Sequence, residues 1–169
     1  MAIPFYAKST GNEGYIKNME VVGFSDLNGV NAFQMALNKT ADGKYYMYCG
    51  SFRGPGWNIV DVTDPTHPTV VNWLEACDPK EFPATNTPKI QVADGLMIGA
   101  LGGGVPFLHG NKPGDKNKSG LMIFDIQQDP VHPKLLSFWD TGVKDGMGVH
   151  RFMYNGGRYV HLSADCPGF

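Results

Sequence analysis

Three side chains in this sequence are of types that carry acid–base chemistry. His150 and His109 are imidazoles, which exchange a proton near neutral pH, and Asp165 is a carboxylate. Such groups act as general acids and bases when they lie within hydrogen-bond distance of a substrate. We therefore take His150, His109 and Asp165 as candidate catalytic residues. For each of them a solvated or turn-forming role is the structural alternative.

Four further side chains are candidates for substrate binding. Arg53 carries a planar guanidinium that can hold an anionic group through two parallel hydrogen bonds. Asn31 and Thr87 offer neutral polar groups near the beginnings of expected strands. Cys166 offers a thiol, whose reactivity would depend on a lowered pKa. Two structural alternatives stay open beside the functional interpretation. Arg53 would only cap backbone carbonyls of its loop, and Cys166 would only form part of an ordinary turn.

Other ionisable side chains are assigned to structure. His67 and His132 occupy the same position in two repeats of the sequence. Asp61 and Asp125 are also matched, so both pairs are expected to belong to repeated structure. His161 lies inside an expected strand, where a packed histidine is the commoner case. No HExxH, GxSxG or paired-carboxylate motif and no phosphate-binding loop occurs in the sequence.

The composition limits the partners. The net charge is −2, the pI is near 6.2 and no basic stripe is present. The sequence therefore lacks the positive patch that binding to nucleic acid or an anionic membrane requires. No stretch approaches the roughly 20 apolar residues that span a bilayer. The three cysteines lie far apart, which predicts reduced thiols. We expect a soluble cytoplasmic protein, unless a leader was removed ahead of residue 1.

A repeat organises the chain. The run G-W-N-I-V-D-V-T-D-P-T-H-P begins at Gly56, and the run G-L-M-I-F-D-I-Q-Q-D-P-V-H-P begins at Gly120. Each is an apolar strand followed by a turn, in which proline presets φ and aspartate bonds the backbone two residues on. Two expected strands precede each run and one follows it. Four antiparallel strands per unit is the composition of a propeller blade.

The ends of the sequence hold incomplete units. A third copy has two expected strands, 149–154 and 158–163, and residues 19–27 match the outermost strand of the other units. A ring whose last blade is closed by strands from both chain ends needs such an orphan strand. The predicted organisation is an N-terminal extension at 1–18, the outer strand of a closing blade at 19–27, blade one at 31–75, blade two at 88–140 and half of blade three at 149–169.

The two runs resemble the repeat of the LVIVD-repeat proteins, G-L-x-I-V-D-V-S-D-P-x-x-P. The resemblance covers roughly residues 20–169 and implies an all-β fold, a β-propeller of four-stranded antiparallel blades. The sequence holds two and a half of these, and open strand edges favour aggregation. A second polypeptide is therefore expected to complete the propeller, through processing of a precursor or as a separately encoded subunit. The repeat motif itself implies no activity.

Propeller topology places a candidate site. Innermost strands line a central channel, and ligand sites favour its mouth. Asn31, Thr87 and His150, at the beginnings of the inner strands, are expected there. The loop at 102–119 is long enough to act as a lid. The loops expected at the same mouth are 51–55, 102–119 and 164–169.

These observations predict one subunit of a two-chain propeller enzyme that acts on a small organic substrate at the channel mouth. Hydrolase or lyase chemistry is expected, and an N-terminal amine on the partner could activate a nucleophile there. Two alternatives stay open: a metal-dependent enzyme with His ligands on the axis, and a non-catalytic interaction propeller. The sequence requires no cofactor, and a transition metal belongs to the first alternative.

Overall fold

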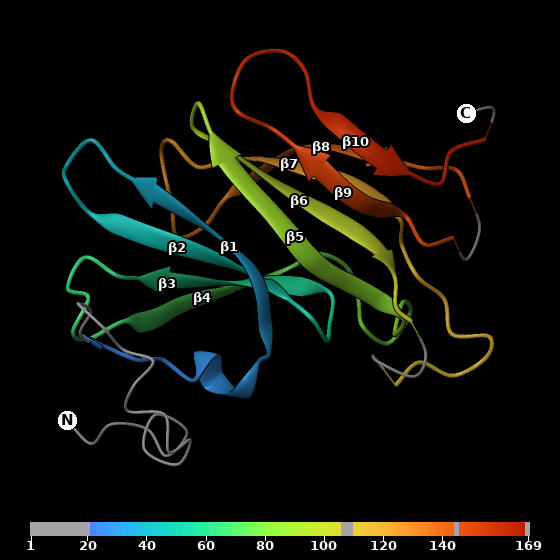
Figure 1. Cartoon of the computed structure of the whole chain (residues 1–169), viewed down its shortest axis with the longest axis horizontal. Coiled ribbons are helices and arrows are strands. Elements are labelled where there is room, and N and C mark those ends of the chain that lie inside the picture. Colours follow the sequence, from blue (N-terminus) through green and yellow to red (C-terminus); the bar gives the residue numbers. More distant parts are fainter. Residues whose placement is uncertain (1–20, 106–109, 144–145, 168–169) are drawn as a thin grey trace, which may run out of the picture.

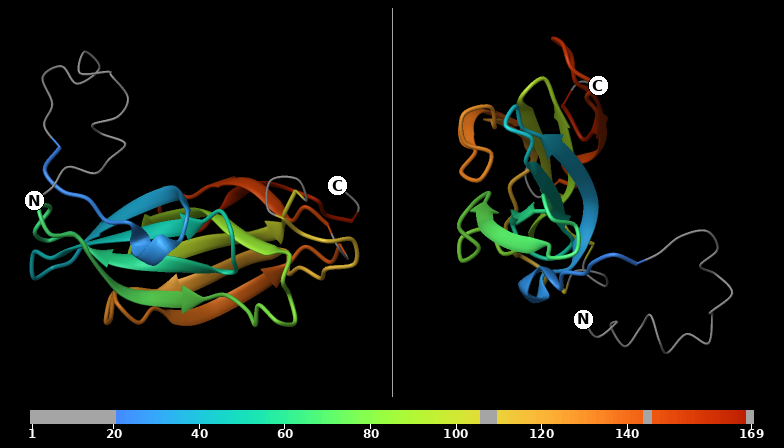
Figure 2. Two further views of the ribbon diagram at one scale, coloured as in Figure 1. Left: turned by 90° about the horizontal axis from the view of Figure 1, so that it is seen from below. Right: turned by 90° about the vertical axis from the view of Figure 1, so that its left-hand side faces the viewer.

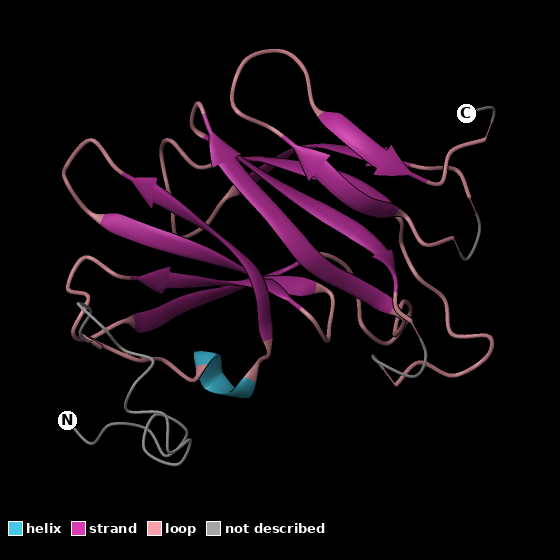
Figure 3. Ribbon diagram, viewed as in Figure 1, coloured by secondary structure: helices cyan, strands magenta, loops and turns pink. Residues whose placement is uncertain are grey.

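The fold is all-β (Figure 1). A computed structural model describes residues 21–105, 110–143 and 146–167 of the chain. In these ranges the one helical element is a short 3-10 helix at Leu27–Gly29, and the rest is strands and loops (Figure 3). No helix in the described residues is long and apolar enough to cross a membrane. The predicted extension at 1–18 and the candidate His109 lie outside the described residues.

Two four-stranded meanders make up most of the molecule. Every strand in them pairs antiparallel with the next one along the chain. A single bridge between Ser51 and Thr87 joins the meanders into one curled sheet (Figure 2). The first meander holds β1 (Ala32–Lys39), β2 (Tyr45–Ser51), β3 (Gly56–Asp61) and β4 (Thr69–Glu75). The second holds β5 (Thr85–Ala93), β6 (Leu96–Gly103), β7 (Gly120–Asp125) and β8 (Lys134–Asp140).

A separate two-stranded sheet follows, formed by β9 (Val149–Met153) and β10 (His161–Ala164). All ten strands that the sequence predicts from residue 31 onward are thus present. The tenth is shorter than the predicted 158–163. Its shortening has a local cause, because the Tyr154 amide donates to the Gln91 side chain and the Tyr154 hydroxyl to the Gly157 carbonyl. The backbone after Met153 therefore leaves the β9–β10 ladder.

Strand β6 is covered on both faces and lies at the centre of the fold. Met97 and Leu101 point into a core shared with the first meander, where the buried Trp57 and Ile59 lie. Ile98, on the opposite face of β6, belongs to a second core that it shares with β9 and β10. The first meander, the second meander and the β9–β10 pair, which we call the three sheets, therefore pack face to face in chain order. Burial on both faces explains why β6 is a nearly continuous apolar run.

Trp57 sets the contact between the two meanders. Its side chain is fully buried and meets the Phe124 ring edge-on, with 5.7 Å between the ring centroids. The indole lies directly over Gly99, where a Cβ would come within 2.2 Å of an indole carbon. Only glycine at position 99 leaves room for the indole at this separation.

The two copies of the repeated turn share two contacts of the aspartate side chain. An Asp64 oxygen accepts from the Thr66 amide, and an Asp129 oxygen accepts from the Val131 amide, both at 2.9 Å. In each turn the histidine three residues after the aspartate places its Nδ1 3.0 Å from the other carboxylate oxygen. The predicted structural role of His67 and His132 is confirmed by these contacts. The second turn also accepts a hydrogen bond from Tyr48, whose hydroxyl lies 2.8 Å from the Pro130 carbonyl oxygen.

The outer strand predicted at 19–27 is not formed in its described part, residues 21–27. A strand needs a neighbouring edge to pair with, and no edge of the described sheets pairs with this segment. The segment instead lies against the first meander. Together with Met35, Leu37 and Met47 it borders a cavity of about 640 Å³. Gly23 packs against the Pro65 carbonyl.

We expect Gly99→Ala to lower the free energy of unfolding by about 1–3 kcal/mol, because the added methyl overpacks the Trp57 site. Urea unfolding followed by far-ultraviolet circular dichroism measures the loss. The double variant Trp57→Phe, Gly99→Ala is the matched control, since the smaller ring vacates the space that the methyl takes. Its destabilisation should be less than the sum of the two single effects, and simple additivity would contradict the proposed contact.

The repeated turns should also make stability depend on acid pH. Hydrogen bonds from the Thr66 hydroxyl and amide and from His67 lower the pKa of Asp64 from 3.8 to about 2. Bonds from His132 lower the pKa of Asp129. A carboxyl whose pKa is lower in the folded state contributes stability above its unfolded pKa and loses it as the pH falls toward the folded value.

We therefore expect the urea midpoint of the wild-type chain to fall between pH 4 and pH 2. The double variant Asp64→Asn, Asp129→Asn should show a smaller fall over the same range. Glu81→Gln, at an exposed site, serves as the control and should follow the wild type. Equal pH dependence in all three proteins would contradict this role of the turns.

Candidate binding site at the ends of the inner strands

The first strands of the three sheets lie side by side. Strand β1 lies beside β5, and β5 lies beside β9 (Figure 1). A bulge interrupts the pairing of β1 between Ala32 and Met35, and another interrupts β5 between Asn86 and Lys89. The bulges occur at matching positions, so Lys89 takes the place in β5 that Met35 takes in β1.

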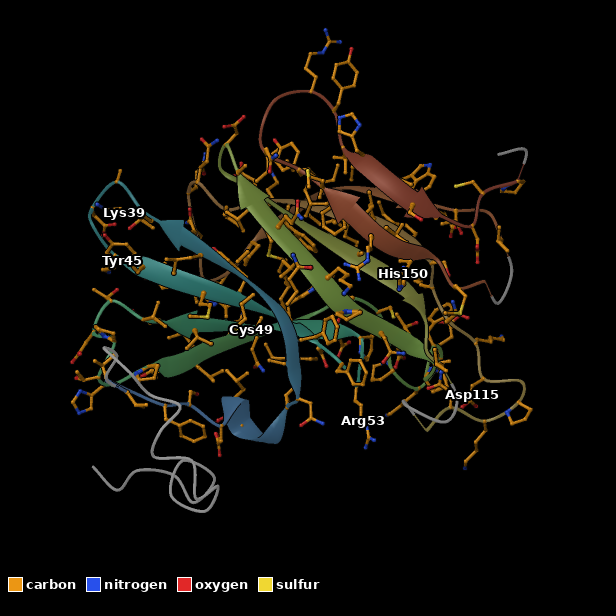
Figure 4. The ribbon with its side chains drawn as sticks, viewed as in Figure 1. Lys39, Tyr45, Cys49, Arg53, Asp115 and His150 are labelled. Atoms are coloured by element: carbon orange, nitrogen blue, oxygen red, sulfur yellow. The ribbon has the colours of Figure 1, made fainter. Side chains whose placement is uncertain are left out.

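A cavity of about 190 Å³ lies at the beginnings of these strands, and we call it the strand-end cavity. His150 borders it from β9 and Lys89 borders it from β5. In Figure 4 the labelled His150 lies over β5 and β9 in the middle of the molecule. Most of the surrounding wall is apolar or backbone. The full lining is Phe33, Phe52, Asn86, Pro88, Lys89, Gly102, Gly103, Val105, Met147, Val149 and His150.

Aromatic rings hold Lys89 in place. Phe33 of β1 stacks on Phe52 of the β2–β3 loop, with 5.3 Å between ring centroids. The Lys89 ammonium lies 3.9 Å from the centroid of the Phe33 ring, within the range of a cation–π contact. This contact holds the charge of Lys89 beside β1.

A second cavity, of about 430 Å³, lies farther along the inner strands, and we call it the inner-strand cavity. It shares Lys89 with the strand-end cavity and adds Arg151 of β9. Partial burial lowers the pKa of Lys89, and the nearby positive charge of Arg151 lowers that pKa further. The lining also includes Gln34, Gln91, His161 and Ser163.

Gln91 fixes β9 against β5. Its amide nitrogen donates to the Phe152 carbonyl at 3.0 Å, and its amide oxygen accepts from the Tyr154 backbone amide. Because both ends of the amide are engaged, the backbone from Phe152 to Tyr154 is held at one position against β5. Lys89 and Arg151 come from different sheets, and the Gln91 hydrogen bonds help to hold them near each other.

The predicted binding residues are mostly engaged in structure. Thr87 is fully buried, and its hydroxyl accepts from the Gly56 amide at 3.0 Å and lies 2.5 Å from the Gly56 carbonyl oxygen. Asn31 precedes β1, and its carbonyl accepts from the Phe52 amide at 2.9 Å. Arg53 is exposed, and Figure 4 shows its side chain pointing outward, away from His150. Of these three, none lines the strand-end cavity.

Asp165 and Cys166 follow β10 at the same end of the fold as His150. The Asp165 carboxylate accepts a hydrogen bond from the Met147 amide at 2.9 Å, and its own amide donates to Gly148 at 3.2 Å. Asp165 therefore positions the backbone at Met147, which lines the strand-end cavity. Cys166 is half-buried and in a free thiol form. Of the predicted site residues, only His150 borders this cavity in the described part of the chain.

The described residues hold no group of three or more His, Cys, Asp or Glu side chains that could bind a metal ion. Cys49 is buried in the first meander, and burial raises the pKa of its thiol to about 11. A thiol with a raised pKa carries little thiolate at neutral pH and is a poor nucleophile.

Sequence reasoning missed Lys89, Phe33, Phe52 and Arg151. One signal was present, because Lys89 puts a charge at the position of an inner strand where the first repeat has Met35. The other three are unremarkable in sequence and become site residues only through contacts between strands. Comparison with protein-family models, with curated proteins and with solved structures finds no match for this chain.

We expect Gln91→Ala to destabilise the chain by about 1–3 kcal/mol, because it leaves the partly buried Phe152 carbonyl and Tyr154 amide without their partner. Hydrogen exchange measured by mass spectrometry should show faster exchange in β9 and β10 and little change in β3. Gln128→Ala, at an exposed turn position, is the matched control. Uniform acceleration over all strands would argue against a local tie.

Proposed function

We propose that this chain is one part of a β-propeller that binds a small organic substrate at the mouth of its central channel, with His150 as an acid–base group. The strand-end cavity carries the proposal, because it joins His150 and Lys89 from two sheets to a pair of stacked aromatic rings. An imidazole at the edge of an apolar cavity is suited to proton transfer. Hydrolysis or a lyase reaction is the chemistry that uses such a group.

The arrangement of sheets supports the propeller. Two meanders of four antiparallel strands follow one another, and each sheet packs a face on the next in chain order. Their first strands lie side by side, as the inner strands of successive blades do. The cavity at the beginnings of these strands would then lie at the channel mouth.

The exposed apolar face of the first meander supports the proposal that a second polypeptide completes the propeller. Met35 and Leu37 on β1 are 58% and 56% exposed, and residues 22–27 cover only part of the face that they occupy. Exposed apolar surface of this kind marks an interface. The partner would supply the remaining blades in a heterodimer, as a product of processing or as a separate subunit. An N-terminal amine on it could serve as a base for a nucleophile near His150.

The partner is tested by native mass spectrometry of the chain purified from the cells that make it. We expect a one-to-one complex with a second polypeptide, because propeller blades require neighbours on both faces. Exposing the chain to a crosslinker should link the partner to the Met35 face, for example through Lys39 on the same strand. A monomeric chain that is stable without a partner would contradict the two-chain propeller.

The site is tested by nuclear magnetic resonance of the assembled protein with two neutral probes, phenyl acetate and benzamide. We expect the His150 ring signals and the amide signals of Phe33 and Phe52 to shift, because these residues border one cavity. His67, in the first repeated turn, is the internal control and should not shift. In the assembled protein, His150→Gln should lower the turnover of a hydrolysed probe by about 10²-fold. Shifts that avoid the cavity would overturn the site.

A further inference from the structure

The inner-strand cavity carries two positive charges and no negative one. Lys89 and Arg151 both line it, and neither its lining nor that of the strand-end cavity includes an Asp or Glu. Among the described residues, no salt bridge involves either side chain. Elsewhere in the described chain Lys44 has an acidic neighbour, Asp42, at 3.9 Å. The two inner-strand cations are therefore without a counter-charge from this part of the protein.

The two charges are held near each other. The Phe33 ring fixes the ammonium of Lys89, and the Gln91 side chain fixes the backbone on both sides of Met153, two residues after Arg151. Like charges that share a pocket repel, and this repulsion adds to partial burial, the larger cause, in lowering the pKa of Lys89. An anion bound between them would relieve the repulsion and add charge-assisted hydrogen bonds.

We infer that the substrate carries an anionic group, a carboxylate or a phosphate, which binds between Lys89 and Arg151 in the inner-strand cavity. This inference rests on the proposed function, because the same substrate would extend past Lys89 into the strand-end cavity and reach His150. The guanidinium of Arg151 can bind two anion oxygens in parallel, while Lys89 acts as a point charge. Gln34 and Ser163 offer neutral polar groups along the same wall.

The two cavities would bind different ends of the substrate. The inner-strand cavity supplies cations and amides and would hold the charged end of the substrate. The strand-end cavity supplies stacked rings and His150 and would hold the apolar, reacting end. Binding energy at the charged end can then orient the other end against the imidazole.

The test uses isothermal titration calorimetry and nuclear magnetic resonance on the assembled protein, with succinate, inorganic phosphate and the neutral succinamide as probes. We expect succinate or phosphate to bind at least about tenfold more tightly than succinamide, with the largest shifts at Lys89 and Arg151. Tighter binding of succinate would identify a carboxylate substrate, and tighter binding of phosphate a phosphorylated one.

Variants connect the binding to the two cations. Lys89→Gln and Arg151→Gln should each weaken anion binding by about tenfold or more. The charge-conserving variant Lys89→Arg should retain most of it, and Arg151→Lys, which keeps the charge but loses the second parallel hydrogen bond, should weaken binding less than Arg151→Gln does. Both comparisons separate lost charge from a damaged fold. Arg158→Gln and Lys134→Gln, exposed outside both cavities, are matched controls and should leave binding within about twofold.

Two failures are distinguishable. If the neutral probes still shift His150 but succinate binds no better than succinamide, the anion site is overturned and the proposed function stands. If no probe, charged or neutral, shifts residues of either cavity, both proposals fail. Anion binding that survives Lys89→Gln and Arg151→Gln would also overturn the assignment of these two residues.

Discussion

The packing of Trp57 over Gly99 is the contact on which the other features depend. The indole fills the space between the two meanders, and the absence of a side chain at Gly99 lets the sheets approach closely enough to exclude water. The indole nitrogen is buried without a hydrogen-bond partner in the described structure. Trp57 thus contributes through apolar area and shape, and that contribution must exceed the cost of the unpaired nitrogen.

The close approach of the meanders determines where the inner strands lie. With β1 held beside β5, Phe33 can cover Lys89. With β9 tied to β5 by Gln91, Arg151 borders the inner-strand cavity and His150 borders the strand-end cavity. The residues that border the two cavities therefore come from three sheets. Their geometry is a consequence of sheet packing and of one side-chain tie.

The inner and outer faces of the sheets differ in how well their apolar side chains are covered. The inner faces of the sheets are filled by two apolar cores, whereas the outer face of the first meander leaves Met35 and Leu37 exposed and only partly covered by residues 22–27. Burying apolar area is the main gain in folding, so a face of this kind is favourable only when something covers it. In the proposed propeller that covering is the next blade.

The sequence by itself determined the ten strands from residue 31 onward, because alternation of apolar residues and the D-P turn are local patterns, and hydrogen bonds at Asp64 and Asp129 form the turns. The outer strand predicted at 19–27 is not formed in residues 21–27, because a strand needs a neighbouring edge that a local pattern does not show. The sequence also separated the structural histidines, His67 and His132, from His150, but it assigned His161 to packing, whereas His161 is exposed and lines the inner-strand cavity. It did not reveal Lys89 and Arg151 as site residues. It assigned substrate binding to Thr87, whose hydroxyl is instead hydrogen-bonded to the Gly56 backbone. Only the tertiary structure decided these roles. Residues far apart in the chain meet through sheet stacking, and a single sequence carries no local signal of which strand faces will pack together.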